Sequence, residues 1–480
     1  MNDDLAVLDA TAQAALIRSR ALQPIELVDA AIARIERVNP QLNAVITPLF
    51  DAARAAARAR DLPDGPFRGV PTLLKDLGAH SAGDPFHAGM CFLRALRWVA
   101  PDESYIVAKM RAAGFVILGK TNTPELGLLP TTEPAAYGAT HNPWQPDHSP
   151  GGSSGGAAAA VAAGLVPAAH ATDGGGSIRI PASHCGLIGL KPSRGRVSLG
   201  PDVGERWGGC AVENSVTRSV RDAAALLDVL AGAMPGDPYT APPPTRPFVD
   251  EVGAPVGRLR IGVLTRSPGG LPVHPDCVAA AENSARLLHS LGHHVDYAHP
   301  AALEDPELMQ AFATIIGCSV ARALDAWSAK TAQTIGATDV EAGTWAVNEL
   351  ARQLPATEYL RAVETAHAHA RRIAQWWADG FELLLTPTAA EPPPRLGSFA
   401  TPAGNPLAGV LRAAPFTTFT APFNITGQPA ISLPLHWSAE HLPIGTHLVA
   451  AYGREDLLIR VAAQLEAAQP WAQRRPAIHA

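Results

Sequence analysis

Residues Ser149–Ser198 read SPGGSSGGAAAAVAAGLVPAAHATDGGGSIRIPASHCGLIGLKPSRGRVS, and this segment contains two serine clusters that are flanked by glycine. The first cluster is Gly151–Gly156, and the second is Asp173–Arg179. Glycine adopts backbone conformations that are closed to other residues, so a serine between glycines is exposed and the neighbouring N–H groups can point at a ligand. These are the features of a serine nucleophile, and the segment is therefore the candidate active site.

The second cluster has the composition of a backbone oxyanion hole. Three consecutive glycines, Gly174, Gly175 and Gly176, precede Ser177. Their N–H groups and that of Ser177 can converge on one point, where the oxyanion of an acyl-transfer reaction would be stabilised. The alanine-rich run at 157–163 separates the two clusters and predicts a buried helix.

The segment has two other interpretations. Glycine and serine clusters are usually flexible linkers, but these bracket an apolar helix and precede the apolar run Cys185–Leu190, so they indicate packed interior. The spacing Gly152-x-Ser154-x-Gly156 matches the nucleophile elbow of α/β-hydrolases, which follows a buried strand. Here His141–Pro150 precedes it, and with three prolines that stretch is not a strand. The match to the elbow is therefore accidental.

The whole segment resembles the signature of the amidase signature family: GGSSGG, a short helix, a glycine-rich loop that ends in the nucleophile, and a basic-proline stretch like Lys191-Pro192. The resemblance implies that Ser177 is the nucleophile and that Ser153 is a bridging serine next to a cis peptide bond. It also implies an α/β fold, the amidase signature fold, with a large mixed twisted β-sheet sandwiched between α-helices.

The resemblance places the third catalytic residue on a lysine upstream. Residues Phe67–Gly78 read FRGVPTLLKDLG, an apolar strand that carries Lys75, one of five lysines among the 38 lysine and arginine residues. By position alone Lys75 would be an ordinary strand residue that reaches solvent, but its context resembles the family's lysine motif. A solvated lysine has a pKa near 10.4, so a lysine that acts as a base must be desolvated, and the flanking Leu73 and Leu74 are compatible with that.

The residues that line the substrate pocket are harder to predict from the sequence. The resemblance puts Gly127, Leu128 and Leu129 at the acyl pocket, which implies an apolar acyl side. We expect segments 79–100, 127–135 and 392–420 to shape the pocket, although 79–100 could equally be a satellite helix on the surface. The aromatic run at 416–425 is expected to line the entrance.

Composition sets the broad class. The 480 residues are 47% hydrophobic with a net charge of −6, which fits one amidase domain over 1–480, with a signature core at about 67–200 and a peripheral helical region at about 303–380. There is no basic block, so we expect no nucleic-acid or membrane partner. The five cysteines show no C-x-x-C spacing, so we expect no metal site. No cofactor is expected, and the absence of a leader-like start predicts a cytoplasmic protein.

Hydrophobic periodicity predicts the remaining elements. Helices are expected at 5–40 (two), 51–60, 102–113, 216–231, 275–291 and 454–466, with a mostly helical stretch at 303–380. Strands are expected at 44–49, 67–78, 115–118, 259–264, 294–297, 381–385, 429–434 and 447–452.

The residues and the resemblance together predict an amidase that hydrolyses a small-molecule amide, anilide or carbamate (urethane) through a Ser-Ser-Lys triad. The tail at 450–458 is similar to the branch with cyclic-dimer nylon-oligomer hydrolases, and carbamate-cleaving relatives belong to the same family. One alternative is an amidotransferase A-type subunit that works in a complex. Another is a non-catalytic binding protein on the same fold, against which the set Lys75, Ser153 and Ser177 argues. A homo-oligomer is compatible with the sequence.

Overall fold

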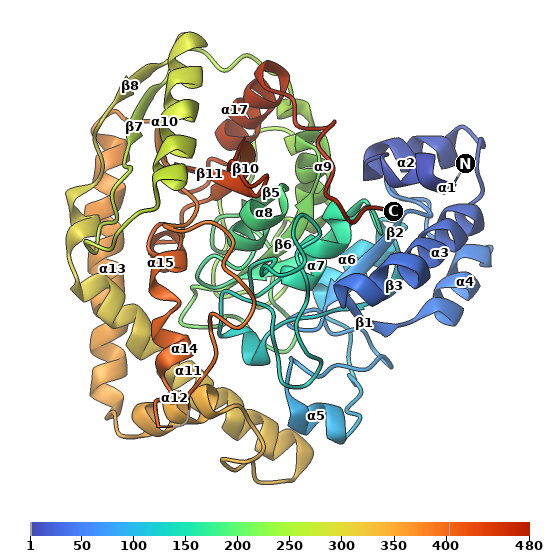
Figure 1. The fold of residues 1–480 in the computed structure, drawn as a ribbon, viewed down its shortest axis with the longest axis horizontal. Coiled ribbons are helices and arrows are strands. Elements are labelled where there is room, and N and C mark those ends of the chain that lie inside the picture. The colour runs from blue at the N-terminus through green and yellow to red at the C-terminus, as the bar shows by residue number, and fades with distance from the viewer. Residues whose placement is uncertain (1, 403) are drawn as a thin grey trace.

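The computed structural model describes residues 2–402 and 404–480, and one mixed sheet of 11 strands runs through the molecule in the order β1-β3-β2-β4-β6-β5-β10-β11-β9-β7-β8 (Figure 1). The strands are β1 (Val45–Pro48), β2 (Pro71–Lys75), β3 (Val116–Thr121), β4 (Ala168–Asp173), β5 (Ile188–Lys191), β6 (Val212–Thr217), β7 (Arg260–Val263), β8 (His294–Asp296), β9 (Leu383–Pro387), β10 (Ala430–Trp437) and β11 (Pro443–Ala450). Strands β2, β3 and β4 run parallel to one another, and so do β7, β8 and β9, while the remaining neighbours pair antiparallel.

Helices surround this sheet. They are α1 (Asn2–Ala6), α2 (Ala10–Arg18), α3 (Pro24–Leu42), α4 (Phe50–Arg58), α5 (Cys91–Ala95), α6 (Tyr105–Ala112), α7 (Gly155–Ala162), α8 (Arg179–Cys185), α9 (Val220–Leu230), α10 (Pro275–Ser290), α11 (Glu307–Thr331), α12 (Ala342–Arg352), α13 (Ala356–Ala378), α14 (Ala408–Leu411), α15 (Ala414–Thr417), α16 (Pro422–Ile425) and α17 (Glu455–Ala468). Three 3₁₀ turns lie at Glu125–Gly127, Phe248–Glu251 and Ala301–Glu304.

Alternation along the strands creates a core on each side of the sheet, because successive side chains of a strand point to opposite faces. On β9, Leu383 and Leu385 pack with the apolar faces of α6, α9, α10 and α17. Leu384, between them, packs on the opposite face with α11 and α13. Further along that opposite face, Leu73 of β2 packs with α3 and the alanine helix α7. The sheet covered by helices on both faces confirms the expected α/β architecture.

The predicted elements largely exist, but two helices differ in their bounds, and several elements, among them β5 and β6, were not expected. The helix expected to stop at Asn39-Pro40 continues to Leu42 and ends at Asn43, which adopts a left-handed conformation (φ 51°). The helix expected over 216–231 is preceded by strand β6 and begins only at Val220. Strand β4 and helix α8, which flank the nucleophile loop, had no counterpart in the sequence interpretation.

The peripheral segment is helical as expected, with α11, α12 and α13 packed together. By length and composition alone α11 is apolar enough to cross a membrane. Its Leu308, Phe312 and Ile315 are instead buried against α13 and the sheet. A buried core helix of a globular protein passes the same test, so α11 gives no reason to expect a membrane span.

Candidate active site

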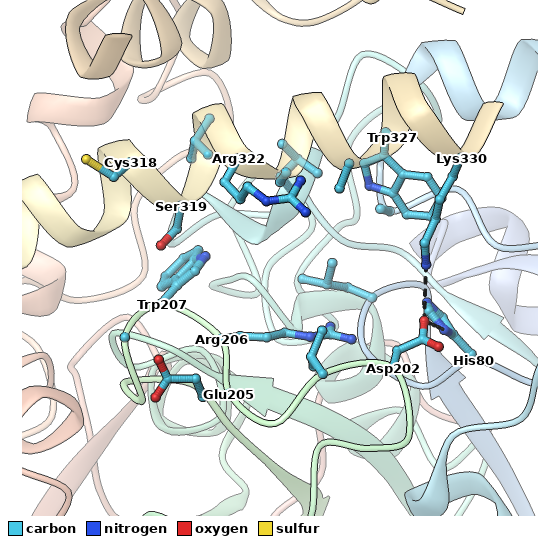
Figure 2. A pocket seen from close by; sticks show the side chains of 18 of the residues that line it. His80, Asp202, Glu205, Arg206, Trp207, Cys318, Ser319, Arg322, Trp327 and Lys330 are labelled. Atoms are coloured by element: carbon cyan, nitrogen blue, oxygen red, sulfur yellow. Dashed lines mark hydrogen bonds and ion pairs between the residues drawn. The ribbon is translucent and has the colours of Figure 1, made fainter. Parts of the chain in front are cut away.

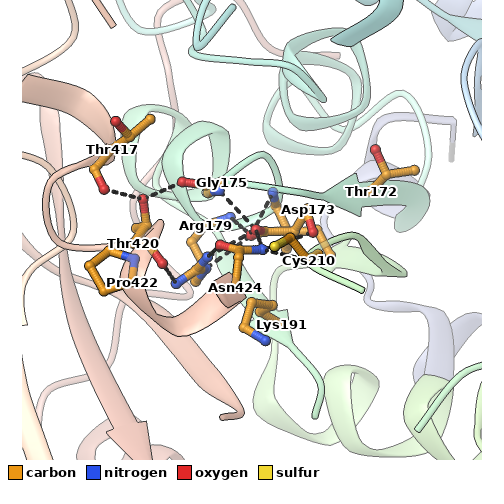
Figure 3. A network of polar contacts seen from close by, with 12 residues as sticks. Thr172, Asp173, Gly175, Arg179, Lys191, Cys210, Thr417, Thr420, Pro422 and Asn424 are labelled. Carbon is orange, nitrogen blue, oxygen red and sulfur yellow. Dashed lines mark hydrogen bonds and ion pairs between the residues drawn. The ribbon is translucent and has the colours of Figure 1, made fainter. Parts of the chain in front are cut away.

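The loop that carries Ser177 is organised around one buried carboxylate, Asp173, at the end of β4 (Figure 3). Its Oδ1 accepts from the N–H of Gly176 at 2.8 Å and its Oδ2 from that of Ile178 at 3.1 Å. The guanidinium of Arg179 donates to both oxygens at 2.9 Å. Burial by itself would raise the pKa of Asp173, but Arg179 and further donors hold it well below its ordinary value. Asp173 is therefore a charged template for the 174–179 turn.

A distant segment closes the same network. The side-chain amide of Asn424, on α16, donates to Asp173 Oδ1 at 2.8 Å and to its backbone oxygen at 3.0 Å. The hydroxyl of Thr420 donates to the carbonyl of Gly175 at 2.6 Å. These bonds hold the nucleophile loop from both sides. The loop is therefore preorganised and does not have to rearrange during the reaction.

Lys75, at the end of β2, directly contacts the first serine cluster. Its Nζ donates to Ser153 Oγ at 2.6 Å and to Thr172 Oγ1 at 2.8 Å. The peptide bond between Gly152 and Ser153 is cis, as the resemblance implied. Ser154 fixes the start of α7, because its Oγ bonds both backbone groups of Thr172, accepting from N at 3.3 Å and donating to O at 3.2 Å.

The charge state of Lys75 follows from its burial. The side chain is fully buried, which disfavours the ammonium form. Burial lowers the pKa of Lys75 to about 7, and the negative charges of Asp173 and Glu213 oppose that decrease. A large share of Lys75 is therefore the neutral amine near neutral pH, and a neutral amine can act as a general base.

Ser153 and Ser177 line one small chamber of about 70 Å³, together with Gly127, Thr172, Gly174 and Glu213. Ser177 is half-buried, so its hydroxyl is accessible from the chamber. The structure thus brings the three predicted catalytic residues to one place, with Lys75 behind Ser153 and Ser177 in the wall of the same chamber.

The predicted oxyanion-hole residues lie around this chamber, but the N–H of Gly176 already donates to Asp173. Gly174 and Ser177 line it, and Gly175 is half-buried beside it. Gly176 has a backbone φ of 138°, and a Cβ there would lie 2.5 Å from Thr420 Oγ1. Because the N–H of Gly176 donates to Asp173, the N–H groups of Gly174, Gly175 and Ser177 are the better candidates for an oxyanion.

The three residues expected at the acyl pocket lie in different surroundings in the structure. Gly127 lines the chamber, and a Cβ on it would lie 3.2 Å from Ser153 Oγ. Leu128 packs in the apolar cluster of Phe86 and Trp327, and Leu129 packs with Ile180 and Phe416. The neighbour that lines the chamber in their place is Leu126.

A larger cavity of about 590 Å³ adjoins the chamber and shares Leu77, Leu126, Arg206 and Trp207 with it. Figure 2 shows α11 along one wall of this cavity and the 202–207 loop opposite. Helix α11 contributes Cys318, Ser319, Arg322, Trp327 and Lys330, and the segment after β2 contributes His80, Phe86 and Ala88.

Several of these residues were missed by the sequence interpretation. Segment 79–100 does border the cavity, but α11 and Arg206–Trp207 were not expected there. The signal that the sequence offered for Trp207 is its place in the run ERWGG. In the structure its φ is positive (54°), which a tryptophan rarely adopts. The expectation for the aromatic run was wrong: Phe416, Phe419 and Phe423 are buried in packed clusters. The segment supports the nucleophile loop through Thr420 and Asn424 instead.

Comparison with known proteins agrees with this geometry. A family model described as Amidase matches residues 26–459. A 6-aminohexanoate-cyclic-dimer hydrolase of Paenarthrobacter ureafaciens is 46% identical over 476 residues, which cover 98% of this chain and 96% of that protein. The solved structure of a 6-aminohexanoate cyclic dimer hydrolase, known also in complex with substrate, superposes with a TM-score of 0.95 at 45% identity over 98% of this chain and 99% of the other. A bacterial aryl acylamidase of the amidase signature family superposes with a TM-score of 0.87 at 30% identity, covering 97% of each chain.

Proposed function

Because the chain belongs to the amidase family and hydrolyses a carbon–nitrogen bond other than a peptide bond, we propose that it does so through an acyl-enzyme formed on Ser177. Ser153 passes the proton and Lys75 is the base. The observation that carries this proposal is the 2.6 Å hydrogen bond between Lys75 Nζ and Ser153 Oγ, in a chamber that Ser177 also lines.

The steps follow from the arrangement of these groups. Ser177 Oγ attacks the carbonyl carbon while its proton moves to Ser153 Oγ, which gives its own proton to the neutral amine of Lys75. The N–H groups of Gly174, Gly175 and Ser177 stabilise the oxyanion. Lys75 then returns the proton through Ser153 to the leaving nitrogen, the C–N bond breaks, and water hydrolyses the acyl-enzyme along the same path.

The larger cavity supports a neutral substrate of moderate size. Three cations, Arg206, Arg322 and Lys330, and three carboxylates, Asp202, Glu205 and Glu213, line the cavity and the adjoining chamber. Lys330 and Asp202 form an ion pair at 3.1 Å. Matched charges leave no excess field for an ionic ligand, while Phe86, Trp207 and Trp327 provide apolar contact area.

The substrate class proposed is therefore an uncharged amide, cyclic or linear, with anilides and aryl carbamates as the variants to compare. The relatives at 46% and 45% identity are hydrolases of the 6-aminohexanoate cyclic dimer, which is a neutral cyclic amide. That compound is the first substrate to test on this chain.

The test uses the purified chain alone, with the cyclic dimer, a linear amide, an anilide and an aryl carbamate. Hydrolysis of at least one by the isolated chain is expected, and none would favour a subunit that needs a complex. Ser177→Ala should lower kcat by about 10⁴-fold or more, because members of a catalytic relay act as a unit. Ser290→Ala, at the exposed end of α10, is the matched control and should keep full activity. Retained activity in Ser177→Ala would reject the nucleophile assignment.

A further inference from the structure

A second set of buried groups lies against the backbone of Lys75. The N–H of Lys75 donates to His170 Nδ1 at 3.3 Å, and His170 Nε2 lies 3.3 Å from Glu213 Oε2. His170 and Glu213 are both almost completely buried. Three neighbouring strands, β2, β4 and β6, supply the chain of contacts, so it crosses the sheet where the chamber begins.

Strand register explains how these side chains meet. Thr172 of β4 stands directly opposite Glu213 of β6 in the antiparallel ladder. His170 is two residues away from Thr172 along β4, so its side chain lies on the same face of the strand. Glu213 consequently borders the chamber beside Thr172, the second hydrogen-bond partner of the Lys75 amine.

The hydrogen bonds fix the tautomer of His170. A backbone N–H can only donate, so Nδ1 of His170 accepts from Lys75 and carries no proton. The ring proton is therefore on Nε2, and it is donated to Glu213. Burial lowers the pKa of His170, which keeps the ring neutral. Burial alone would raise the pKa of Glu213, but the hydrogen bond from His170 and nearby positive charge lower it, so Glu213 is ionised.

The two carboxylates near Lys75 differ in how far their charge is neutralised. Asp173 is held by Arg179 in a buried ion pair at 2.9 Å. In the part of the chain that the structure describes, the side chain that hydrogen-bonds to Glu213 is the neutral ring of His170. Glu213 is thus a buried negative charge in the chamber wall whose nearest partner carries no full positive charge.

On the basis of the proposed function, we propose that Glu213 is a positioning residue: through His170 it fixes the strand at Lys75, and its charge makes the amine of Lys75 a stronger base for the proton of Ser177. An equally buried amine without this carboxylate would be neutral over a wider pH range, but it would be a weaker base. The charge of Glu213 therefore balances the share of neutral amine against its basicity.

The other charged and titratable groups around this pair are accounted for. They are Asp173 facing Lys75, His80 and Arg206 facing Glu213, and Lys75 and Lys120 facing His170. Burial lowers the pKa of His80 to about 4, so this ring is neutral above pH 5 and does not titrate with Lys75.

The test measures the protonation of Lys75 with a reagent whose leaving group needs no proton. Phenylmethylsulfonyl fluoride reacts with an activated serine: the Oγ–S bond forms, the S–F bond breaks, fluoride leaves, and the serine proton passes to the base. The inactivation rate of the wild-type chain should rise with pH along a limb that reports deprotonation of Lys75. Ser177→Ala must remain unlabelled by mass spectrometry; labelling there would reject the proposed function rather than the role of Glu213.

Glu213→Gln removes the charge and keeps the shape, so its limb should lie about one pH unit lower than that of the wild type. Well below the limb, where each pH unit is a tenfold change in neutral amine, inactivation should be faster than in the wild type, by up to about tenfold. Above the limb, where Lys75 is neutral in both proteins, hydrolysis of an alkyl amide should be slower in the variant, because its amine is the weaker base. A limb at the wild-type position would overturn the proposal.

Two further variants complete the test. Glu466→Gln removes a carboxylate whose pKa burial raises to about 7 on the remote helix α17, and its limb should coincide with that of the wild type. Glu213→Asp keeps the charge but withdraws it by one methylene, so its limb should lie between the other two. If Glu213→Gln fails to fold, as judged by circular dichroism, the Asp variant decides, and an unmoved limb there rejects the role.

Discussion

Replacing Lys75 with methionine is expected to abolish hydrolysis and yet stabilise the protein at pH 7. Methionine has a similar length and no charge to desolvate. In the folded chain burial lowers the pKa of Lys75 to about 7 from the ordinary 10.5. Between pH 7 and 10.5 the unfolded chain therefore binds more protons at this position than the folded chain. The stability of the wild type must rise with pH across that window.

The magnitude follows from the two pKa values. At about 1.4 kcal/mol per pKa unit, the ammonium form of Lys75 costs the folded wild type about 4 kcal/mol at pH 7. The substitution also loses hydrogen bonds to Ser153 Oγ and Thr172 Oγ1, each worth about 0.5–1.5 kcal/mol. We therefore expect Lys75→Met to be about 1–3 kcal/mol more stable at pH 7.

The pH dependence of this difference is the sharper signature. The cost of the buried ammonium is fully present at and below pH 7 and disappears toward pH 10.5, so the advantage of the variant should shrink by about 1.4 kcal/mol per pH unit in between. Urea unfolding followed by circular dichroism at pH 6, 7, 8 and 9 measures it. Lys330→Met, which removes a half-exposed lysine paired with Asp202, is the control. Parallel stability curves for Lys75→Met and the wild type would refute the reasoning.

Two other substitutions test the groups around Lys75. Thr172→Val removes the acceptor at 2.8 Å from the Lys75 amine. A hydrogen bond to the charged form of the amine is worth about 1 kcal/mol more than one to the neutral form, so the rising limb of kcat/KM should move down by about 0.7 pH units. An unchanged pH profile contradicts the assignment. Asp173→Asn leaves the guanidinium of Arg179 buried without its counter-charge and should lower the free energy of unfolding by about 3–5 kcal/mol, measured by urea unfolding; a loss near zero would show that the pair does not hold the loop.

A local signal in the sequence was enough to propose two of the site residues. Ser153 and Ser177 stand in glycine clusters that only a close backbone approach requires. Lys75 differs from them, because by position alone it would be an ordinary strand residue, and its context singled it out only through the resemblance to the family's lysine motif. Ordinary periodicity was sufficient for α3, α10 and α17, whose apolar faces repeat at helical spacing.

The parts that the sequence could not predict depend on contacts between distant segments. Strand β4 reads AAHATD, whose residues favour strands weakly, and its conformation is set by pairing with β6 in the middle of the sheet. Asn424 supports Asp173 across 251 positions of sequence, and no local pattern distinguishes it from another loop asparagine. The position of α11 at the cavity could not be predicted either, because its apolar face has the same pattern as that of a core helix.

The two buried carboxylates near Lys75 have different surroundings. Both negative charges raise the pKa of Lys75, which burial lowers. Asp173 also accepts from Arg179 and from the N–H groups of Gly176 and Ile178, so its replacement would disturb the nucleophile loop together with the amine. Glu213 contacts the ring of His170 instead, so its replacement should change the basicity of Lys75 and leave the bonds of the loop in place. Glu213 is therefore the position at which the basicity of Lys75 can be tested separately from the order of the nucleophile loop.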